Sequence, residues 1–359
     1  MNLGGGIKMK AAIFEGIGKI KVKEIERPLP KKGEILLKVM ACAICGTDVR
    51  IIKHGHPRVI PPFIIGHEIT GIIEEINGEI VRFKKGDRVV VAPPGIPCGE
   101  CFYCKNSLSN ICPHKASFAY ELPGGFSEYM IIPRQAIMKG NLIKIPNSIS
   151  FNEACITEPL ACCINGQKFL TISAAESILI IGSGPIGLLH MQLAKVKGAR
   201  NVGLADISPS RIEKAGLFEP DFVINSNEVD LVEEMRRKTK GTGVNAVIAA
   251  CSSKAAVEQA FKIISRGGEI LLFAGLPKEE SQFMMDINFV HYNELKIYGS
   301  FASTHESSLE AMGYIRDGRI RASKIITHRY RLEEIEEAIE MAGSSEALKV
   351  VIAPHQTDS

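Results

Sequence analysis

The pattern of hydrophobic and polar residues changes about halfway along the chain. In the first half, short runs rich in β-branched residues are separated by glycine and proline, which is typical of short strands joined by turns. These expected strands are residues 10–15, 20–25, 34–39, 69–76 and 87–92. From Ser177 onward the apolar runs become continuous, as expected for strands buried on both faces of a parallel sheet.

After Ser177, strand patterns alternate with helical patterns. The expected strands are 177–182, 201–206, 221–225, 246–251 and 268–275, and the expected helices are 184–196, 209–215, 229–239 and 255–264. This order predicts a doubly wound α/β fold with a parallel sheet. Beyond residue 297 we expect two amphipathic helices, at 307–317 and 332–342, and a final strand at 347–352. Because this tail is too small to form a domain, we expect it to return and complete the first one.

The composition narrows the classes of protein that fit. A chain of 359 residues with 45% hydrophobic residues is long enough for two domains with substantial cores. The net charge of +3 gives no basic surface for nucleic acid, and no apolar run reaches the roughly 18 residues of a membrane span. The N-terminus lacks the apolar segment of a signal peptide, so the ten cysteines indicate a reducing cytoplasm.

Four cysteines within fifteen residues form the most specific motif of the chain. They are Cys98, Cys101, Cys104 and Cys112. Four thiolates at this spacing suit a tetrahedral Zn²⁺, whereas the alternative, a pair of disulfides, is disfavoured in a chain without a secretory signal. Because four sulfurs leave zinc no open position, we expect this site to be structural and a second, open site to lie elsewhere.

A glycine-rich motif follows the expected strand 177–182 and opens a helix. Its residues are Gly182, Ser183, Gly184, Pro185, Ile186 and Gly187. Glycines permit a tight turn and a close approach of the backbone to a pyrophosphate, and the helix N-terminus supplies N–H donors. Asp206 lies nineteen residues past Gly187, where a carboxylate binds ribose hydroxyls and repels a 2′-phosphate, which favours NAD over NADP. The other interpretation of the motif is a tight turn without a ligand.

The two ends of such a cofactor have further candidate residues. Arg211 is near enough to Asp206 to stack on the adenine, or else it is a solvated surface residue. We expect the nicotinamide end near two turns that follow strands at the carboxyl edge of the sheet. The candidates there are Phe273, Ala274, Gly275, Ser300 and Phe301. The alternative is that these are ordinary turns between a strand and a loop.

Four further residues are candidates for the open metal site. Cys45, His67, Glu68 and Glu158 offer one thiolate, one imidazole and one or two carboxylates, a set suited to Zn²⁺ with a vacant position. Taken singly, each has another explanation, since cysteine is often a small buried hydrophobic residue. An alcohol bound at such a site becomes an alkoxide at moderate pH, by the logic that lowers the pKa of zinc-bound water. The alkoxide can then pass hydride to a nicotinamide.

Together these motifs resemble the zinc-dependent medium-chain dehydrogenase/reductase superfamily, in particular its sorbitol and threonine dehydrogenase-like alcohol dehydrogenases. The matching pieces, spread over nearly all of the chain, are C-G-T-D at 45–48, G-H-E at 66–68, the four-cysteine loop, E-P-L at 158–160, G-S-G-P-I-G at 182–187 and Asp206. The resemblance implies an α/β fold in which a Rossmann doubly wound parallel sheet is inserted into a GroES-like β-rich catalytic domain. It places the catalytic domain with both zinc sites at 1–157, the NAD-binding domain at 158–296 and the return to the catalytic domain at 297–359.

The resemblance also implies roles for single residues. Cys45 and His67 occupy zinc-ligand positions, and Glu158 stands where classical alcohol dehydrogenases have a cysteine. Glu68 and Glu158 exchange as ligands in such enzymes, and the sequence leaves open which of them holds the zinc at rest. Thr47 matches the residue that takes the substrate proton.

The proton relay of the family is interrupted at Arg50, where a histidine is usual. Arginine cannot release a proton near neutral pH, because its pKa exceeds about 12. Either Arg50 is a fixed cation near the ribose or pyrophosphate, or another group ends the relay. His54 and His56 are candidates because the pKa of histidine suits this role, although each is equally suited to the surface or the substrate pocket.

One function with two alternatives follows from these features. We expect an oxidoreductase that binds two zinc ions per chain, one catalytic and one structural, and transfers hydride from a secondary alcohol to NAD in the inter-domain cleft. A small polar substrate is expected, a polyol or sugar alcohol first and an amino alcohol such as threonine next. The alternatives are a zinc-free quinone or enoyl reductase of the same superfamily and a non-catalytic binding protein of this fold. We expect a homodimer or homotetramer, as is usual in the family, with no nucleic-acid or membrane partner.

Overall fold

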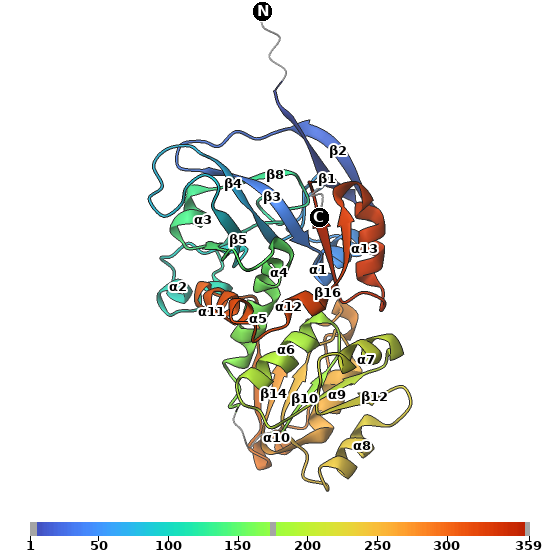
Figure 1. The fold of residues 1–359 in the computed structure, drawn as a ribbon. Coiled ribbons are helices and arrows are strands. Elements are labelled where there is room, and N and C mark those ends of the chain that lie inside the picture. The colour runs from blue at the N-terminus through green and yellow to red at the C-terminus, as the bar shows by residue number, and fades with distance from the viewer. Residues whose placement is uncertain (1–5, 173–176, 356–359) are drawn as a thin grey trace, which may run out of the picture. The chain divides into compact units, whose positions relative to one another are not determined.

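The computed structural model describes residues 6–172 and 177–355, which form two compact units (Figure 1). The first unit extends to Ala161 and resumes at Ser303, and the second covers Cys162–Ala302. The boundaries expected from the sequence, at 157/158 and 296/297, lie a few residues before these. Both groups of candidate metal ligands belong to the first unit, and the glycine motif belongs to the second.

The first unit is built mainly from short strands, with small helices between them. Its elements, with η for a 3₁₀ helix, are β1 (Lys8–Gly16), β2 (Lys19–Glu26), β3 (Ile35–Ala43), α1 (Gly46–His54), β4 (Glu68–Ile76), β5 (Arg88–Val91), β6 (Gly95–Ile96), α2 (Phe102–Lys105), η1 (Ser109–Ile111), β7 (Ala116–Ser117), β8 (Tyr129–Ile132), α3 (Arg134–Met138), β9 (Leu142–Lys144), α4 (Phe151–Cys155), the start of α5 (Thr157–Gln167), α11 (His305–Arg316), α12 (Ala322–Ile325), β16 (Ile326–Arg331), η3 (Leu332–Glu334), α13 (Ile335–Gly343) and β17 (Lys349–Ala353).

The main sheet of this unit has seven strands in the order β16-β17-β3-β4-β5-β9, with β8 also paired on β3. β3 and β4 are antiparallel, and Ala43 at the end of β3 is paired with Glu68 at the start of β4. The chain therefore leaves β3 towards Cys45 and enters β4 from His67 at the same place in the sheet. This pairing positions one cluster of candidate metal ligands.

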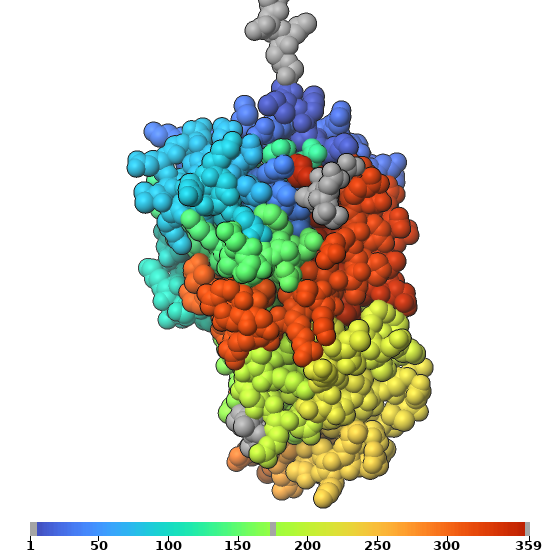
Figure 2. Space-filling model, viewed as in Figure 1, coloured from blue at the N-terminus to red at the C-terminus, as the bar shows by residue number. Residues whose placement is uncertain are grey.

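The C-terminal segment completes the same sheet. β17 pairs antiparallel with β3, at Val351 with Ala43, and parallel with β16. α13 packs on α1 and on β2. In the space-filling view the red C-terminal residues lie among blue and green residues from the first half of the chain (Figure 2). The first unit is therefore formed from both ends of the chain.

The second unit is a doubly wound α/β unit. Its elements are the rest of α5, β10 (Ser177–Ile181), α6 (Pro185–Val196), β11 (Asn201–Asp206), α7 (Pro209–Gly216), β12 (Phe222–Asn225), α8 (Leu231–Lys238), β13 (Val244–Ala249), α9 (Lys254–Ile263), β14 (Ile264–Leu272), η2 (Lys278–Glu280), α10 (Ile287–Tyr292) and β15 (Lys296–Gly299). The strand order β12-β11-β10-β13-β14-β15, with all pairs parallel, is the Rossmann order, so the predicted fold class is confirmed. No helix within the two described ranges is both long and apolar enough to cross a membrane.

One strand differs from the prediction in a way that the sequence explains. β14 begins at Ile264, whereas the apolar pattern placed its start at 268. In its pairing with β13 the register shifts between Ile264 and Glu269, so Gly267 and Gly268 lie in a bulge. Glycines and a bulge interrupt the apolar run, which hid the first part of the strand.

A buried histidine in the middle of α6 helps to position the helix that carries the glycine motif. His190 has no exposed surface. Gln167 Nε2 donates to the backbone oxygen of His190 at 2.7 Å and lies 3.2 Å from its Nδ1, while the Phe273 ring is 4.4 Å away, centroid to centroid. Burial lowers the pKa of His190 to about 3, so the ring is neutral and belongs to the core.

We predict that His190 makes the protein sensitive to acid. The unfolded chain binds a proton near the ordinary pKa of 6.5, whereas the folded ring does not until about pH 3. This contribution to stability is therefore present above pH 6.5 and is lost as the pH falls, by about 2 kcal/mol between roughly pH 7.5 and pH 5. Denaturant unfolding across this range should show a shallower pH dependence in His190→Asn than in the wild type. The exposed His291→Asn is the control, and an unchanged pH dependence in His190→Asn would contradict the prediction.

Candidate functional site

The four cysteines of the loop between β6 and β7 converge on one point. Their sulfurs are separated by 3.8 Å for Cys98 and Cys104, 3.5 Å for Cys101 and Cys104, 3.7 Å for Cys101 and Cys112, and 3.6 Å for Cys98 and Cys112. Sulfurs about 2.3 Å from a central tetrahedral ion lie about 3.8 Å from one another. The separations therefore fit a metal ion and are far longer than the roughly 2.05 Å of a disulfide. None of the ten cysteines, all of which lie in the described residues, forms a disulfide.

The surroundings in this loop shift the pKa values of two of the thiols in opposite directions. The N–H groups of Glu100 and Cys101 lower the pKa of Cys98 to about 6. Burial raises the pKa of Cys104 to about 12, even though the N–H of Gly99 lies 3.4 Å from its sulfur. The lowered pKa of Cys98 and the convergence of the four sulfurs support a structural zinc site.

The second group of ligands lies where β3 ends and β4 begins. The ligand atoms of Cys45, His67 and Glu68 all lie within 4.8 Å of one another, and His67 and Glu68 are buried. This set of thiolate, imidazole and carboxylate suits zinc and supplies fewer ligands than the four that close a structural site.

A glycine next to His67 makes this close approach possible. Gly66 has a φ of +92°, and a side chain there would lie 2.7 Å from the Phe126 ring and 2.9 Å from the Cys42 sulfur. Any other residue would be strained in this conformation and would collide with the core. Gly66 therefore allows His67 to turn in towards Cys45.

Asp48 orients two of the three ligands. It has no exposed surface, its Oδ2 accepts a hydrogen bond from the Cys45 N–H at 2.9 Å, and its Oδ1 lies 3.4 Å from His67 Nδ1. Burial acts to lower the pKa of His67, but Asp48 and Cys45 outweigh burial and raise it well above its ordinary value. Because a metal binds the neutral ring, a metal and a proton compete for His67. Asp48 is part of the C-G-T-D motif, but the motif alone did not indicate this role.

Glu68 forms a buried ion pair that no sequence motif indicated. Lys349 on β17 is 4% exposed, and its Nζ donates to Glu68 Oε1 at 2.7 Å and to the Ile44 carbonyl oxygen at 3.3 Å. Burial raises the pKa of Glu68 to about 6 although Lys349 acts to lower it. Burial acts to lower the pKa of Lys349, but Glu68 and Cys45 outweigh it and raise it, so this lysine stays charged. Glu68 Oε2 is buried without a hydrogen-bond partner among the described residues.

Glu158 is a neighbour of this cluster, outside the set whose ligand atoms lie within 4.8 Å of one another. It is 7% exposed and lies in the first turn of α5. Its charge raises the pKa of both Glu68 and Lys349, so the carboxylate is within electrostatic range of them. The structure therefore brings together Cys45, His67 and Glu68 most closely and keeps Glu158 beside them.

The candidates for proton transfer lie on and just after α1. Thr47 is half-buried in the first turn, and Arg50 Nη2 lies 3.5 Å from its Oγ1. His54, at the end of the helix, is exposed, whereas His56 is half-buried. The His56 ring lies 5.1 Å from the Tyr120 ring, which in turn lies 6.5 Å from the ring of His67. Tyr120 carried no sequence motif and was not predicted.

The glycine motif adopts the predicted strand–turn–helix geometry. Gly182 has a φ of +105°, Gly184 caps α6, and Pro185 is its first residue. A side chain on Gly187 would lie 1.8 Å from the Gly182 carbonyl oxygen, so the helix packs against the turn only with glycine there. Ile186 follows Pro185 in the first turn of α6.

Asp206 lies at the end of β11, and both of its carboxylate oxygens accept hydrogen bonds. Its Oδ2 accepts from Ser183 N at 2.6 Å and Ser183 Oγ at 2.9 Å, and its Oδ1 accepts from Ser208 N at 3.0 Å. The motif and Asp206 are thus joined by Ser183. Arg211 lies near the turn: its Nη1 is 4.0 Å from the position that a Cβ atom on Gly184 would occupy. The predicted residues at this end of the site are therefore assembled.

The predicted nicotinamide residues follow β14 and β15. Phe273 N and Ala274 N donate to the Ala249 carbonyl oxygen, at 3.2 and 3.3 Å, and Ser300 N donates to the Leu272 carbonyl oxygen at 3.3 Å. Gly275 and Phe301 are exposed, and Phe301 has 61% of its surface accessible. These turns lie at the carboxyl ends of their strands, the edge where dinucleotides bind.

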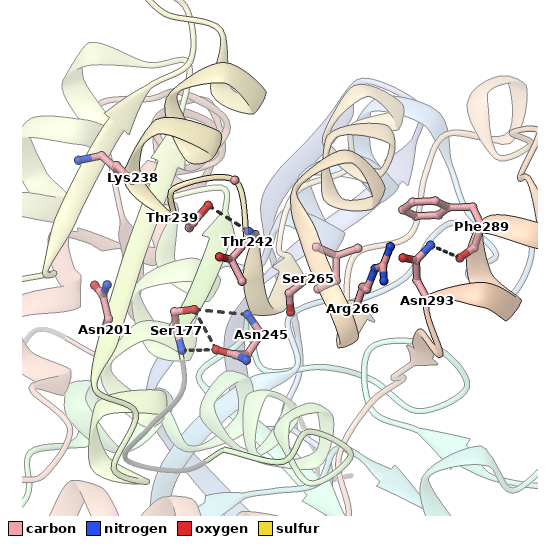
Figure 3. A pocket seen from close by; sticks show the side chains of 13 residues that line it. Ser177, Asn201, Lys238, Thr239, Thr242, Asn245, Ser265, Arg266, Phe289 and Asn293 are labelled. Atoms are coloured by element: carbon pink, nitrogen blue, oxygen red, sulfur yellow. Dashed lines mark hydrogen bonds between the residues drawn. The ribbon is translucent and has the colours of Figure 1, made fainter.

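A depression of about 730 Å³ lies at the opposite edge of the same sheet (Figure 3). It is lined by residues at the amino ends of β10, β13 and β14, among them Ser177, Asn245 and Ser265, and by the loop after α8. None of the predicted site residues lines it. Ligands of open parallel sheets bind at the carboxyl edge, so this depression is not the dinucleotide site.

Known proteins match the chain over both units. Residues 31–146 match the alcohol dehydrogenase GroES-like domain, and residues 185–315 match the zinc-binding dehydrogenase domain. Sorbitol dehydrogenase of Bacillus subtilis (strain 168) is 32% identical over 356 residues, 97% of this chain and 98% of that protein. L-threonine 3-dehydrogenase of Pyrococcus horikoshii is 33% identical over 335 residues, 91% of this chain and 93% of that protein. A solved zinc-binding dehydrogenase from Sinorhizobium meliloti 1021, bound to NADP, has a TM-score of 0.90 and 29% identity, with 97% of this chain and 100% of that chain covered.

We predict that Lys349→Met destabilises the protein by about 3 kcal/mol or more, because it leaves the Glu68 carboxyl buried without its counter-charge. Denaturant unfolding at pH 8 measures the loss. Arg236→Met is the matched control, since Arg236 pairs with Glu233 at the surface and its loss should cost less than about 1 kcal/mol. The double variant Lys349→Met/Glu68→Gln should recover part of the loss. Wild-type stability of Lys349→Met would show that the pair does not hold this part of the fold.

Proposed function

Because the chain belongs to the zinc-type medium-chain dehydrogenase/reductase superfamily, we propose that it is a zinc-dependent, NAD-dependent dehydrogenase of polyols or sugar alcohols. The observation that carries this proposal is the cluster of Cys45, His67 and Glu68, in which Cys45 is half-buried and the other two residues are buried. A zinc-free reductase of the same superfamily would not need this ligand set. The four sulfurs of the loop favour a second, structural zinc ion.

The chemistry assigned to the cluster follows from its residues. Zinc held by Cys45, His67 and a carboxylate would supply the Lewis acidity that makes a substrate hydroxyl acidic near neutral pH. Asp48 keeps His67 and the Cys45 backbone in place, and Lys349 keeps Glu68 in place. We assign the relay of the substrate proton to Thr47, whose hydroxyl oxygen accepts that proton while its own hydroxyl proton passes to water. The Arg50 guanidinium 3.5 Å from Thr47 Oγ1 favours this, because a cation stabilises the negative charge that develops on the hydroxyl oxygen.

The choice of NAD rests on Asp206. Ser183 and Ser208 fix its carboxylate at the end of β11, where an anion repels a 2′-phosphate. Arg211 is a nearby cation, and its charge would instead attract a 2′-phosphate. One relative of known structure was solved with NADP and another with NADH, so the superfamily accommodates both cofactors and the local charges decide.

The substrate class rests on the relatives and on two residues. Relatives include a sorbitol dehydrogenase and a threonine dehydrogenase, both of which oxidise alcohols with further polar groups. Glu158 in place of a cysteine agrees with both of these classes. Arg50 in place of the usual relay histidine argues mildly against a strict threonine dehydrogenase. We therefore place polyols before amino alcohols.

We also propose a cytoplasmic location and a homodimer or homotetramer. The absence of disulfides among the ten cysteines favours a reducing compartment, because the four thiols of the loop lie close enough together to be oxidised elsewhere. The oligomeric state is carried over from the usual state of the superfamily.

The proposal predicts metal content and activity together. Purified protein should contain about two zinc ions per chain by elemental analysis. With NAD it should form NADH from a panel of sugar alcohols, faster than from simple monohydroxy alcohols. A chelator that removes only the catalytic zinc should abolish turnover, because the substrate hydroxyl then loses its Lewis acid. Zinc-free protein that reduces quinones or enones would refute the proposal in favour of the reductase alternative.

We predict that Asp206→Gly lowers the preference for NAD over NADP by about tenfold or more, measured as the ratio of kcat/KM values. The reason is the loss of an anion that binds ribose hydroxyls and repels a phosphate. Glu213→Ala, which removes an exposed carboxylate from the following helix α7, is the control and should leave the ratio unchanged. A wild-type enzyme that uses only NADP would contradict the role given to Asp206.

A further inference from the structure

Two loops far apart in sequence form a polar wall beside the proposed catalytic ligands. The wall consists of His56, Arg58, Tyr120 and Glu121. The Tyr120 ring lies 6.5 Å from the ring of His67, so the wall directly neighbours a metal-ligand side chain. All of these residues belong to the first unit.

Within the wall, the Tyr120 ring is held by stacking against Arg58 rather than by a hydrogen bond to its hydroxyl. Arg58 stacks over the ring at 4.7 Å, and its Nε and Nη2 donate to the two carboxylate oxygens of Glu121 at 2.6 and 2.8 Å. Glu121 also accepts from the backbone N–H of Ser117 at 2.9 Å. A guanidinium fixed by two parallel hydrogen bonds offers its face to an aromatic ring. Among the described residues no hydrogen bond of the Tyr120 phenolic oxygen is found.

His56 supplies a second donor beside the Tyr120 ring. Its ring meets the Tyr120 ring edge-on at 5.1 Å. The Arg58 N–H donates to His56 Nδ1 at 3.2 Å, so in the neutral ring the hydrogen lies on Nε2. The wall thus presents one hydroxyl and one ring N–H that its internal hydrogen bonds do not use.

We propose that Tyr120 and His56 bind the hydroxyl vicinal to the one that is oxidised, and so select diols and polyols over monohydroxy alcohols. This inference rests on the proposed function and names the residues that determine its specificity. A site with polar groups aimed at a substrate hydroxyl discriminates against an analogue that lacks it, because those groups then lose their partner. Arg58 and Glu121 act as positioning residues that fix the Tyr120 ring.

A second cluster of an arginine, a tyrosine and a histidine serves as an internal control. Arg27 stacks over the Tyr129 ring at 4.5 Å, and the His355 ring meets it edge-on at 5.5 Å. Tyr129 lies on β8 and pairs with Lys38 near the start of β3, away from the end that leads to the metal ligands. Only the Tyr120 cluster borders His67, so the same substitution at the two tyrosines separates a binding role from a packing role.

The test compares three substrates that share one secondary alcohol. Propan-2-ol carries no neighbouring polar group, propane-1,2-diol carries a vicinal hydroxyl, and 1-aminopropan-2-ol carries a vicinal amine. The wild type should prefer the diol. Tyr120→Phe should lower kcat/KM for the diol about tenfold, mainly through KM, and leave propan-2-ol unchanged, as expected for one lost neutral hydrogen bond. Tyr129→Phe should leave all three values unchanged.

A second variant and a binding measurement complete the test. Arg58→Lys keeps the charge but loses the paired hydrogen bonds to Glu121, so it should lose part of the diol preference at unchanged thermal stability. Ligand-observed NMR should show weaker binding of the diol to Tyr120→Phe than to Tyr129→Phe, independently of turnover.

The possible failures are distinguishable. Equal losses for the diol and propan-2-ol in Tyr120→Phe, or no loss at all, would overturn the inference and leave the proposed function standing. A wild-type preference for the amine would overturn the assignment to a hydroxyl. A wild type that oxidises no alcohol with NAD or NADP would overturn both the inference and the proposed function.

Discussion

The buried ion pair between Glu68 and Lys349 is the constraint on which the rest of the candidate site depends. It joins residues 281 positions apart, the start of β4 and the start of β17, and both side chains are almost fully buried. Neither charge can be buried alone without a large desolvation cost, so the C-terminal strand and the ligand-bearing part of the sheet must form together. We infer that the pair fixes one arrangement of Glu68 rather than adding much net stability. The ligand geometry is thus a property of the whole unit.

The charges around this pair explain why the cluster suits a divalent cation. The acidic groups Cys45, Asp48, Glu68 and Glu158 outnumber the two basic groups, Lys349 and His67, and their negative charge raises the pKa of both basic side chains. The raised pKa of His67 is the response of the side chain to that excess of negative charge. A dication would replace the proton on His67 and compensate the thiolate and the carboxylates together. The four-cysteine loop follows the same logic with sulfurs alone, at separations that match one tetrahedral ion.

Much of the fold and site followed from the sequence, because the patterns concerned are local. The strand 201–206 and the helix over 185–196 appear in the structure within about one residue of their expected bounds, since continuous apolar runs and a Gly-Pro helix start are unambiguous signals. β14 was placed too late because Gly267 and Gly268 in its bulge interrupt the pattern. His54 is exposed and His56 is half-buried against Tyr120, a difference that two histidines in K-H-G-H-P do not reveal. Lys349 and Tyr120 lie outside every motif, so no local signal marked them.

The sequence by itself determined the ligand types and their local spacing: four cysteines within fifteen residues, C-G-T-D, G-H-E, and a glycine turn between an apolar strand and a helix. Such features are set by covalent spacing and backbone sterics, which operate over a few residues. Tertiary structure alone decided that Glu68 is held by Lys349 while Glu158 remains a neighbour of the cluster. Tertiary structure also decided that Arg58 stacks over Tyr120 and that this ring lies beside His67. These relations depend on strand pairing between segments far apart in the chain and on the free-energy cost of burying charge. No single stretch of residues determines either the pairing or that cost.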